Sequence, residues 1–292
     1  MRDFSADHRW LSINTATVRR QRGQDWNLLQ ILDACAARCI RAVSPWRDQV
    51  HAAGLDAVAR TIRAHGLELS GYCRGGMFTY GDAAGRDAAR DDNRRALDEA
   101  CLLGAPCLVL VVGGLPGALT GRPAHQDIAR ARAQVAEGIA ALLDDARERR
   151  LPLAIEPLHP MYAADRACVN TLEQALDLCD ALDPGRSGAL GVAVDAYHVW
   201  WDPKLQAQIG RAGRERLLAF HVCDWLLPTT DLLEDRGMMG DGVIDLRQLR
   251  GWVEATGFAG YAEVEIFSRA NWWQRDGGEV LDTCIERFGT CV

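Results

Sequence analysis

The sequence predicts an α/β fold, a single (β/α)8 or TIM barrel that forms one domain over residues 1–292. The hydrophobic pattern switches repeatedly between short β-rich runs and longer segments with 3.6-residue spacing. Eight segments of each kind alternate, and no change of composition separates them. The alternative, an open doubly wound sheet, normally carries a glycine-rich phosphate turn after its first strand, and "SINTATVRR" has none.

The predicted strands are short apolar runs that begin with "WLSINTA" and end with "YAEVEIFS". They cover residues 10–16, 41–46, 67–73, 107–114, 151–158, 189–197, 217–224 and 261–268. Each is followed by an amphipathic helix, over residues 27–39, 52–65, 86–103, 126–149, 171–182, 203–212, 245–256 and 277–288. Gly66 and Gly257 stand where a helix would stop, and Thr171 opens "NTLEQAL" with a capping pattern.

Composition and charge limit the classes of partner. A net charge of −7 and a pI near 5.5 give no basic footprint for a nucleic-acid backbone, so we expect a small-molecule partner and no nucleic acid. The longest uncharged run, residues 101–121, contains five glycines and two prolines, so it predicts a helix end, a strand and a loop rather than a membrane span. Ten scattered cysteines and no signal peptide at "MRDFSADHRW" predict a reducing, cytoplasmic location.

Acidic and imidazole side chains stand at the ends of four successive predicted strands. Barrel active sites lie at the C-terminal ends of the strands, where loops converge. Strands five to eight end with Glu156 in "AIEPLHP", Asp195 in "VAVDAYH", His221 in "AFHVCDW" and Glu265 in "AEVEIFS". Each interrupts an apolar strand at a position that faces inward, so we expect all four side chains to point at one spot.

Three carboxylates at one spot repel one another unless a cation compensates them. Oxygen donors with one imidazole suit one divalent ion, Mn²⁺ or Mg²⁺, with Co²⁺ and Zn²⁺ as alternatives. Taken singly, an Asp after a strand often caps a helix, and a lone His often bonds a carbonyl. Four such residues in succession favour the metal site.

The motifs "IEPL", "VDAYH", "FHVCD" and "EVEIF" resemble the metal-binding core of the xylose isomerase-like superfamily, the sugar phosphate isomerase/epimerase family, especially its ketose 3-epimerase branch. That branch has a Glu, Asp, His, Glu quartet, a His three residues after the Asp, and an R-x-x-x-G-x-G pattern. His198 and "RGMMGDG", with Arg236, Gly240 and Gly242, match both features. The resemblance covers the second half of the chain strongly and the first half only through strand order.

The resemblance implies an isomerase of carbohydrate metabolism that assembles as a homodimer or homotetramer. It also implies that Glu156 and Glu265 serve as metal ligands and as catalytic proton carriers. The chain departs from the branch at His159 and Tyr162, where Asn and a second Glu are common. Both departures fall on substrate contacts and not on the metal.

Further residues near strand ends are candidates for substrate binding. His198 and Arg236 would hold substrate oxygens, and tryptophans after strands would provide apolar platforms for sugar C–H faces. Asp224 either orients the site or caps the following loop, and His159 either contacts the sugar or is a buried ring bonded to a carbonyl. The predicted substrate-binding residues are His198, Arg236, His159, Trp46, Trp225, Asp224 and Arg74, with Asn14 as a weaker candidate.

Two loops bear on the substrate. The segment "WLLPTTDLLEDRGMMGDGVID" is far longer than a usual strand-to-helix loop, so we expect it to cover the site. The segment "VVGGLPG" could cradle a phosphate, but no basic residue follows it until Arg122. An unphosphorylated sugar is therefore the favoured substrate.

The leading hypothesis is a divalent-metal-dependent isomerase or epimerase of a free ketose or keto sugar, which acts through proton abstraction beside a carbonyl and an enediolate. The alternative is a metal-dependent lyase or hydratase that acts on 3-keto-glycosides by β-elimination. An abasic-site endonuclease would need more histidines and a basic groove than seven histidines and a charge of −7 provide. A sugar-binding module without catalysis would not need two opposed glutamates.

Overall fold

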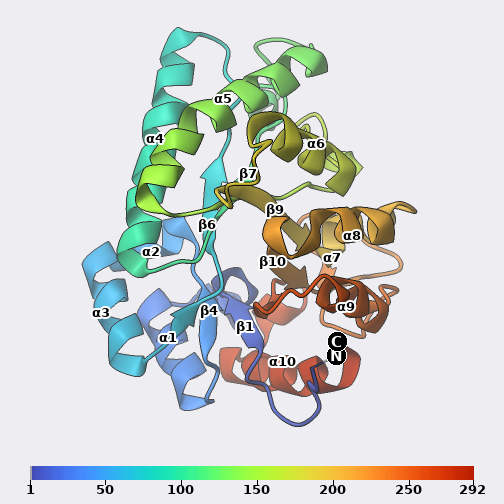
Figure 1. Cartoon of the computed structure of the whole chain (residues 1–292). Helices are drawn as coiled ribbons and strands as arrows, with labels where there is room; N and C mark the ends of the chain where they lie inside the picture. Colours follow the sequence, from blue (N-terminus) through green and yellow to red (C-terminus); the bar gives the residue numbers. More distant parts are fainter. Residues whose placement is uncertain (1) are drawn as a thin grey trace.

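The computed structural model describes residues 2–292 and confirms the α/β barrel. Parallel strands occupy the middle of the molecule and helices surround them (Figure 1). The main sheet has nine strands in the order β5-β4-β1-β13-β10-β9-β8-β7-β6. These are β1 (Leu11–Asn14), β4 (Ala42–Ser44), β5 (Glu68–Leu69), β6 (Tyr72–Gly76), β7 (Leu108–Val111), β8 (Leu153–Ile155), β9 (Leu190–Asp195), β10 (Leu217–Val222) and β13 (Ala262–Val264).

The predicted third strand, residues 67–73, is divided between β5 and β6. β5 pairs with β4, whereas β6 pairs with β7, so consecutive pieces of chain form the two edges of the sheet. The Cys73 amide also donates to the Pro45 carbonyl at 3.1 Å, and a parallel bridge joins Trp46 to Cys73. These contacts bring β6 against the end of β4 and close the ring.

Eight helices lie near their predicted positions. They are α1 (Leu28–Ala37), α3 (Leu55–His65), α4 (Ala83–Leu103), α5 (Ile128–Arg149), α6 (Leu172–Leu182), α8 (Leu205–Arg216), α9 (Leu246–Ala255) and α10 (Gly277–Cys291). The predicted helix 52–65 is wrong at its start, because Gly54 at φ +88° separates it from α2 (Arg47–Ala53). The predicted cap is present, since the Thr171 side chain accepts from the Gln174 amide at 3.2 Å.

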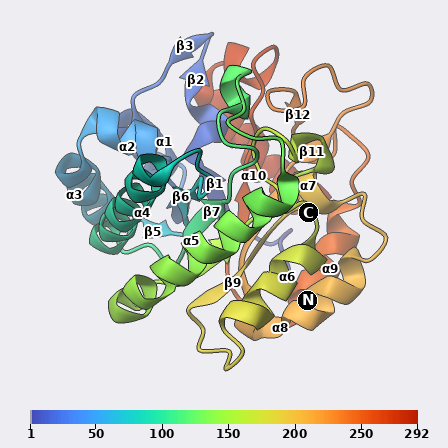
Figure 2. The same ribbon diagram turned by 90° about the horizontal axis from the view of Figure 1, so that it is seen from above.

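Shorter elements decorate the C-terminal end of the barrel. α7 (Ala196–Val199) follows β9 directly, and the hairpins β2 (Arg20–Gln21) with β3 (Gln24–Asp25) and β11 (Asp224–Trp225) with β12 (Arg236–Gly237) rise above it. In the view from above, β2, β3, β11 and β12 are labelled along one side of the molecule (Figure 2). The 3-10 turns are η1 (Thr15–Val18), η2 (Ala118–Thr120), η3 (Pro160–Tyr162) and η4 (Trp272–Gln274).

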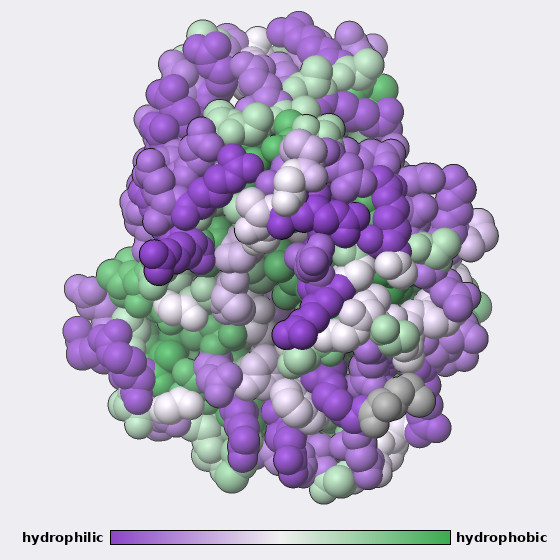
Figure 3. Space-filling view, viewed as in Figure 1, coloured by the Kyte–Doolittle hydropathy of each residue, from purple (hydrophilic) through white to green (hydrophobic). Residues whose placement is uncertain are grey.

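The buried apolar side chains lie between the strands and the helices that surround them. Apolar side chains of the strands and of the inner helix faces form one continuous core, as expected for a parallel sheet covered by helices. On the face seen in Figure 3, hydrophilic residues cover most of the helices and hydrophobic ones show mainly in the recesses between them. None of the described helices combines the length and hydrophobicity that a bilayer crossing requires.

Candidate metal centre

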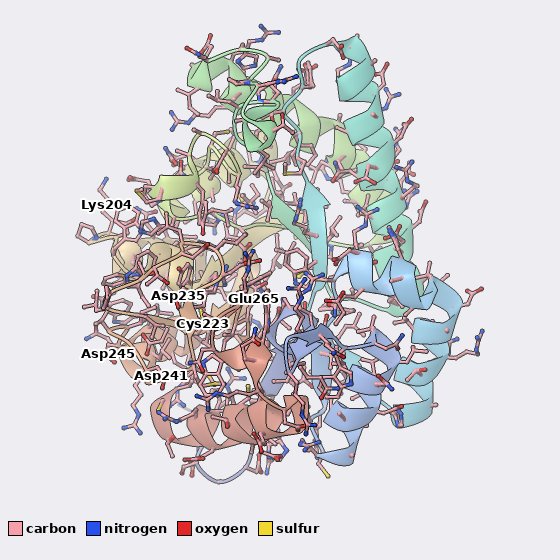
Figure 4. All side chains as sticks on the ribbon, turned by 180° about the vertical axis from the view of Figure 1, so that it is seen from behind. Lys204, Cys223, Asp235, Asp241, Asp245 and Glu265 are labelled. Carbon is pink, nitrogen blue, oxygen red and sulfur yellow. The ribbon has the colours of Figure 1, made fainter. Side chains whose placement is uncertain are left out.

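The structure brings together the four predicted ligands. Glu156 follows β8, Asp195 ends β9, His221 lies in β10 and Glu265 follows β13, so they come from four neighbouring strands. One ligand atom from each lies within 4.8 Å of the others, and all four side chains are buried. In Figure 4, Glu265 lies near the middle of the ring of strands, whereas Asp241, Asp245 and Lys204 lie at the periphery.

Asp195 combines the two roles that its sequence position suggested. Its Oδ1 atom accepts from the Tyr197 amide at 2.8 Å and so caps α7. Its Oδ2 atom faces the cluster, 3.1 Å from Arg236 Nη1 and 3.6 Å from His198 Nε2. The cap fixes one carboxylate oxygen, which leaves the other oriented toward the centre.

His221 is oriented by acidic groups on both sides of its ring. Its Nδ1 atom lies 2.9 Å from Glu156 Oε1 and 4.0 Å from Glu265 Oε2, so this nitrogen faces the cluster. Its buried Nε2 atom has no hydrogen-bond partner among the described residues and lies 3.6 Å from Glu263 Oε1. Burial alone would lower the pKa of His221, but Glu263, Glu156 and Glu265 raise it well above its ordinary value.

Glu263 is a site residue that our sequence analysis did not single out. It is paired with His221 across β10 and β13 and with Ser12 across β1. The side chain is 1% exposed and accepts from Ser70 Oγ at 2.7 Å and from Asn14 Nδ2 at 2.8 Å. A signal was present, because Glu263 and Glu265 are two apart on one strand and therefore share a face.

Asn14 supports the centre instead of facing substrate. Its amide group donates to both Glu263 and Glu265, the latter at 2.9 Å. Its carbonyl oxygen accepts from Trp46 Nε1 at 2.7 Å. The prediction of a sugar contact by Asn14 is therefore corrected, since its whole hydrogen-bonding capacity is directed at neighbouring side chains and at the Ala16 amide.

Arg236 supplies a buried positive charge beside the acidic cluster. Its Nη1 atom lies 3.1 Å from Asp195 Oδ2 and 3.0 Å from Glu265 Oε2, and its Nη2 atom lies 3.1 Å from His198 Nε2. Burial disfavours the charged form of Asp195, but Arg236, His198 and His221 lower the pKa of Asp195 to about 2. Burial raises the pKa of Glu265 to about 8, and Arg236 opposes that rise. Burial lowers the pKa of His198 to about 3, which keeps its ring neutral.

The donor set fits a divalent cation. Three carboxylates and one imidazole nitrogen converge at distances that a single ion spans, and the orphaned His221 Nε2–H would be free to face Glu263. Carboxylate-backed imidazoles are common metal ligands, because the carboxylate fixes the ring tautomer and orientation. The cluster therefore has the composition and burial of a metal-binding site.

A cavity of about 260 Å³ opens onto the cluster. It is lined by Glu156 and Glu265, whereas Asp195 and His221 are fully buried and are not among its lining residues. Four of the predicted substrate contacts also line it, namely His198, Arg236, Trp46 and Arg74. The two glutamates come from β8 and β13, which two other strands separate, so both reach a small ligand in the cavity.

Three predicted substrate contacts, Asp224, Trp225 and His159, are not among the cavity-lining residues. Asp224 caps the loop, because its oxygens accept from the amides of Trp225, Gly240 and Ile244 at 2.9–3.0 Å. The His159 ring stacks on Trp225 with centroids 4.8 Å apart, and burial lowers its pKa. Its Nδ1 atom accepts from the Met161 amide, so the carbonyl bond considered for it is also absent.

The long segment after β10 contributes to the cavity wall. Leu233 and Glu234 line the cavity wall, and the Leu232 carbonyl accepts from the Tyr197 hydroxyl at 2.8 Å. Gly242 permits the return of this segment, because a Cβ atom there would lie 2.1 Å from the Trp225 carbonyl oxygen. In the R-x-x-x-G-x-G pattern, Arg236 thus contacts the acidic cluster, and Gly242 allows the loop to pack closely against Trp225.

Comparison with known proteins places this architecture. A protein from Sinorhizobium meliloti with a known crystal structure is 57% identical, with a TM-score of 0.90 over 97% of this chain and 98% of that one. An IolI protein with a bound zinc atom is 18% identical, with a TM-score of 0.78 over 95% of each chain. The 3-keto-D-glucoside 4-epimerase YcjR from E. coli is 17% identical, with a TM-score of 0.72 over 97% of this chain and 99% of that one. A search of proteins with curated functions gave no match.

The two more distant structures show the fold alone, whereas the family comparison covers most of the chain. The model of the family described as xylose isomerase-like TIM barrel matches residues 32–284, which include all four clustered residues. The chain therefore belongs to the xylose isomerase-like TIM barrel family.

Proposed function

We propose that the protein is a divalent-metal-dependent isomerase or epimerase of a free ketose or keto sugar. The observation that carries the proposal is the convergence of Glu156, Asp195, His221 and Glu265 within 4.8 Å beneath a ligand-sized cavity. Carboxylate-rich donor sets favour Mn²⁺ or Mg²⁺, with Co²⁺ and Zn²⁺ as alternatives. The bound zinc of the IolI structure and the epimerase activity of YcjR support a metal-dependent proton transfer in this fold.

The chain supplies the groups that such a reaction requires. A bound divalent cation polarises the substrate carbonyl and acidifies the adjacent C–H bond. Glu156 and Glu265 line the cavity from two separate strands, so one of them, ionised, would accept the substrate proton, and the other, protonated beforehand, would deliver its own proton to the enediolate. The neutral His198 ring and the Arg236 guanidinium line the same cavity and orient substrate oxygens. The long loop restricts access of water to the intermediate.

Exchange in D₂O tests the proposal against the lyase alternative. The Mn²⁺-loaded protein is incubated with a panel of ketoses and with a 3-keto-glucoside, and NMR follows both C–H exchange and aglycone release. We expect deuterium to enter beside the carbonyl without aglycone release, and exchange to cease in chelator-treated protein. Aglycone release would establish the lyase, and an absence of exchange with every sugar would refute the isomerase. His159, the departure from the epimerase branch that made a lyase credible, does not line the cavity.

Glu263→Gln is expected to weaken Mn²⁺ binding by about 10- to 100-fold, the usual cost of losing a carboxylate that supports a metal ligand. The substitution removes the negative charge that faces His221 Nε2 at 3.6 Å and keeps the volume of the side chain. Isothermal titration calorimetry with Mn²⁺ measures the effect, and the exposed Glu279→Gln is the control. An unchanged affinity in a folded Glu263→Gln protein would show that this carboxylate does not support the site.

A further inference from the structure

Two arginines in the cavity wall lack an acidic partner. Arg74 and Arg166 both line the cavity and are both half-buried. Within residues 2–292, no carboxylate comes within 4.0 Å of either guanidinium, and the Arg166 guanidinium lies 5.8 Å from the centroid of the Tyr162 ring. Other arginines of the same cavity differ, since Arg20 pairs with Asp25 at 2.9 Å and Arg236 pairs with two buried acids.

Arg74 lies at an irregularity of the β6 backbone. In the β6–β7 register, Cys73 pairs with Val109 and Gly75 pairs with Leu110, so Arg74 is the extra residue of a bulge. Bulges are common beside active sites, where they redirect a side chain. The bulge thus interrupts the regular alternation of side chains between the two faces of β6, and the Arg74 side chain lies in the cavity wall.

The two guanidinium groups act on each other. Burial, and after it the positive charge of Arg166, lower the pKa of Arg74 from its ordinary value. Partly desolvated like charges without counter-ions are costly, and a bound anion would relieve the cost through charge-assisted hydrogen bonds.

The acidic groups of the cavity wall have partners of their own. A divalent cation held by the cluster, together with Arg236, would neutralise its three carboxylates. Glu263, which does not line the cavity, faces His221 and accepts from Ser70 and Asn14. Glu234, the other acid in the wall, pairs with Arg269. Within residues 2–292, Arg74 and Arg166 therefore leave two positive charges without a carboxylate at ion-pair distance.

We propose that Arg74 and Arg166 form an oxyanion subsite, so that the substrate carries a carboxylate or phosphate group in addition to its reacting carbonyl. This inference deepens the proposed function and rests on it. Both arginines and the two glutamates line one cavity of about 260 Å³, so all four are accessible to a ligand bound in it. The subsite adds an anionic group to the substrate class expected from the sequence, which was an unphosphorylated sugar, because the positive charge comes from β6 and from the segment after η3 and not from "VVGGLPG".

Binding of simple anions to chelator-treated protein tests the subsite without the metal or the reaction. Isothermal titration calorimetry uses inorganic phosphate in one arm and D-glycerate in the other, with wild type, Arg74→Met and Arg166→Met. We expect at least one probe to bind wild type, and each substitution to weaken it about tenfold or more, as the loss of hydrogen bonds to a charged group implies. Arg20→Met, which removes a cavity arginine that has its own partner, is expected to bind as wild type does.

A second arm measures D₂O exchange with neutral ketoses and with sugar acids or sugar phosphates of similar length. We expect anionic substrates to be preferred, and Arg74→Met and Arg166→Met to raise KM for them by a larger factor than for neutral sugars. An absence of exchange with every substrate would refute the proposed function. It would not decide the subsite, which the calorimetry with phosphate and D-glycerate tests independently of the reaction. Binding of the probes by Arg74→Met and Arg166→Met with the affinity of wild type, no binding by wild type, or a preference for neutral sugars would each overturn the subsite.

Folding of the variants is the remaining control. Because neither arginine has an ion-pair partner, their removal is expected to leave the unfolding temperature unchanged or to raise it. The conservative Arg74→Lys, which keeps the charge but loses the planar fork, is expected to retain part of the anion affinity. Loss of anion binding only in variants that unfold at a lower temperature would count against the subsite.

Discussion

Glu156→Gln and Glu265→Gln are each expected to abolish proton exchange at the substrate carbon while the barrel remains folded. Both side chains line the cavity, and a glutamine at either position keeps the shape of the glutamate but cannot accept or return a proton. General acid–base catalysis contributes about 10²- to 10⁴-fold to such steps, so the exchange rate should fall by at least this factor. The measurement is deuterium incorporation by NMR under conditions that saturate each variant with Mn²⁺.

Saturation with metal matters because the same two carboxylates are also candidate ligands. Metal content is therefore determined on the samples used for exchange. Glu234→Gln is the matched control, because Glu234 lines the same cavity but pairs with Arg269 outside the cluster. We expect this control to retain exchange. Wild-type exchange in either Glu156→Gln or Glu265→Gln would refute the paired-glutamate mechanism.

Arg236→Ala is expected to lower the free energy of unfolding of the metal-free protein by about 3–5 kcal/mol. The substitution removes the partner of Asp195, which is 0% exposed, and of Glu265, which is 3% exposed. A buried charge left without its partner is among the costliest defects that a single substitution creates. Urea unfolding in the presence of a chelator measures the loss, and Mn²⁺ should recover more stability in the variant than in wild type.

Asp195 makes the free energy of unfolding of the metal-free protein depend on pH. The folded protein holds the pKa of this carboxyl at about 2, below its ordinary value of 3.8, so its ionised form stabilises the fold. This contribution is present above pH 3.8 and is lost as the pH falls toward 2, where the difference between wild type and Arg236→Ala should narrow. Arg20→Ala, which breaks an exposed pair, should cost about 0–1 kcal/mol. A loss below about 1 kcal/mol for Arg236→Ala would contradict the account of this buried charge.

The barrel and the four clustered residues could be predicted because both depend on local pattern and a general rule. The period of hydrophobic residues marks the strands and helices, and parallel strands bring their C-terminal ends to one rim. Positions such as Asp195 and His221 are then visible as polar interruptions at strand ends. Gly54 was also visible, but a helix pattern that continues on both sides of a glycine does not show that its backbone leaves the helix.

The supporting contacts depend on residues that are distant in sequence. Asn14 and Glu263 are 249 positions apart, so neither pattern nor spacing indicates their hydrogen bond. His159 follows the fifth strand as a substrate ligand would, but its orientation is set by Trp225 from the loop after the seventh. Similarly, Arg74 and Arg166 meet only because β6 and the segment after η3 border one cavity.

The central claim is that Glu156, Asp195, His221 and Glu265 hold one divalent ion. The most direct test is a crystal grown with Mn²⁺, measured at wavelengths on both sides of the manganese absorption edge. We predict one anomalous peak within coordination distance of an oxygen from each carboxylate and of His221 Nδ1. A peak elsewhere, or a metal-saturated crystal with no peak between these four side chains, would contradict the account.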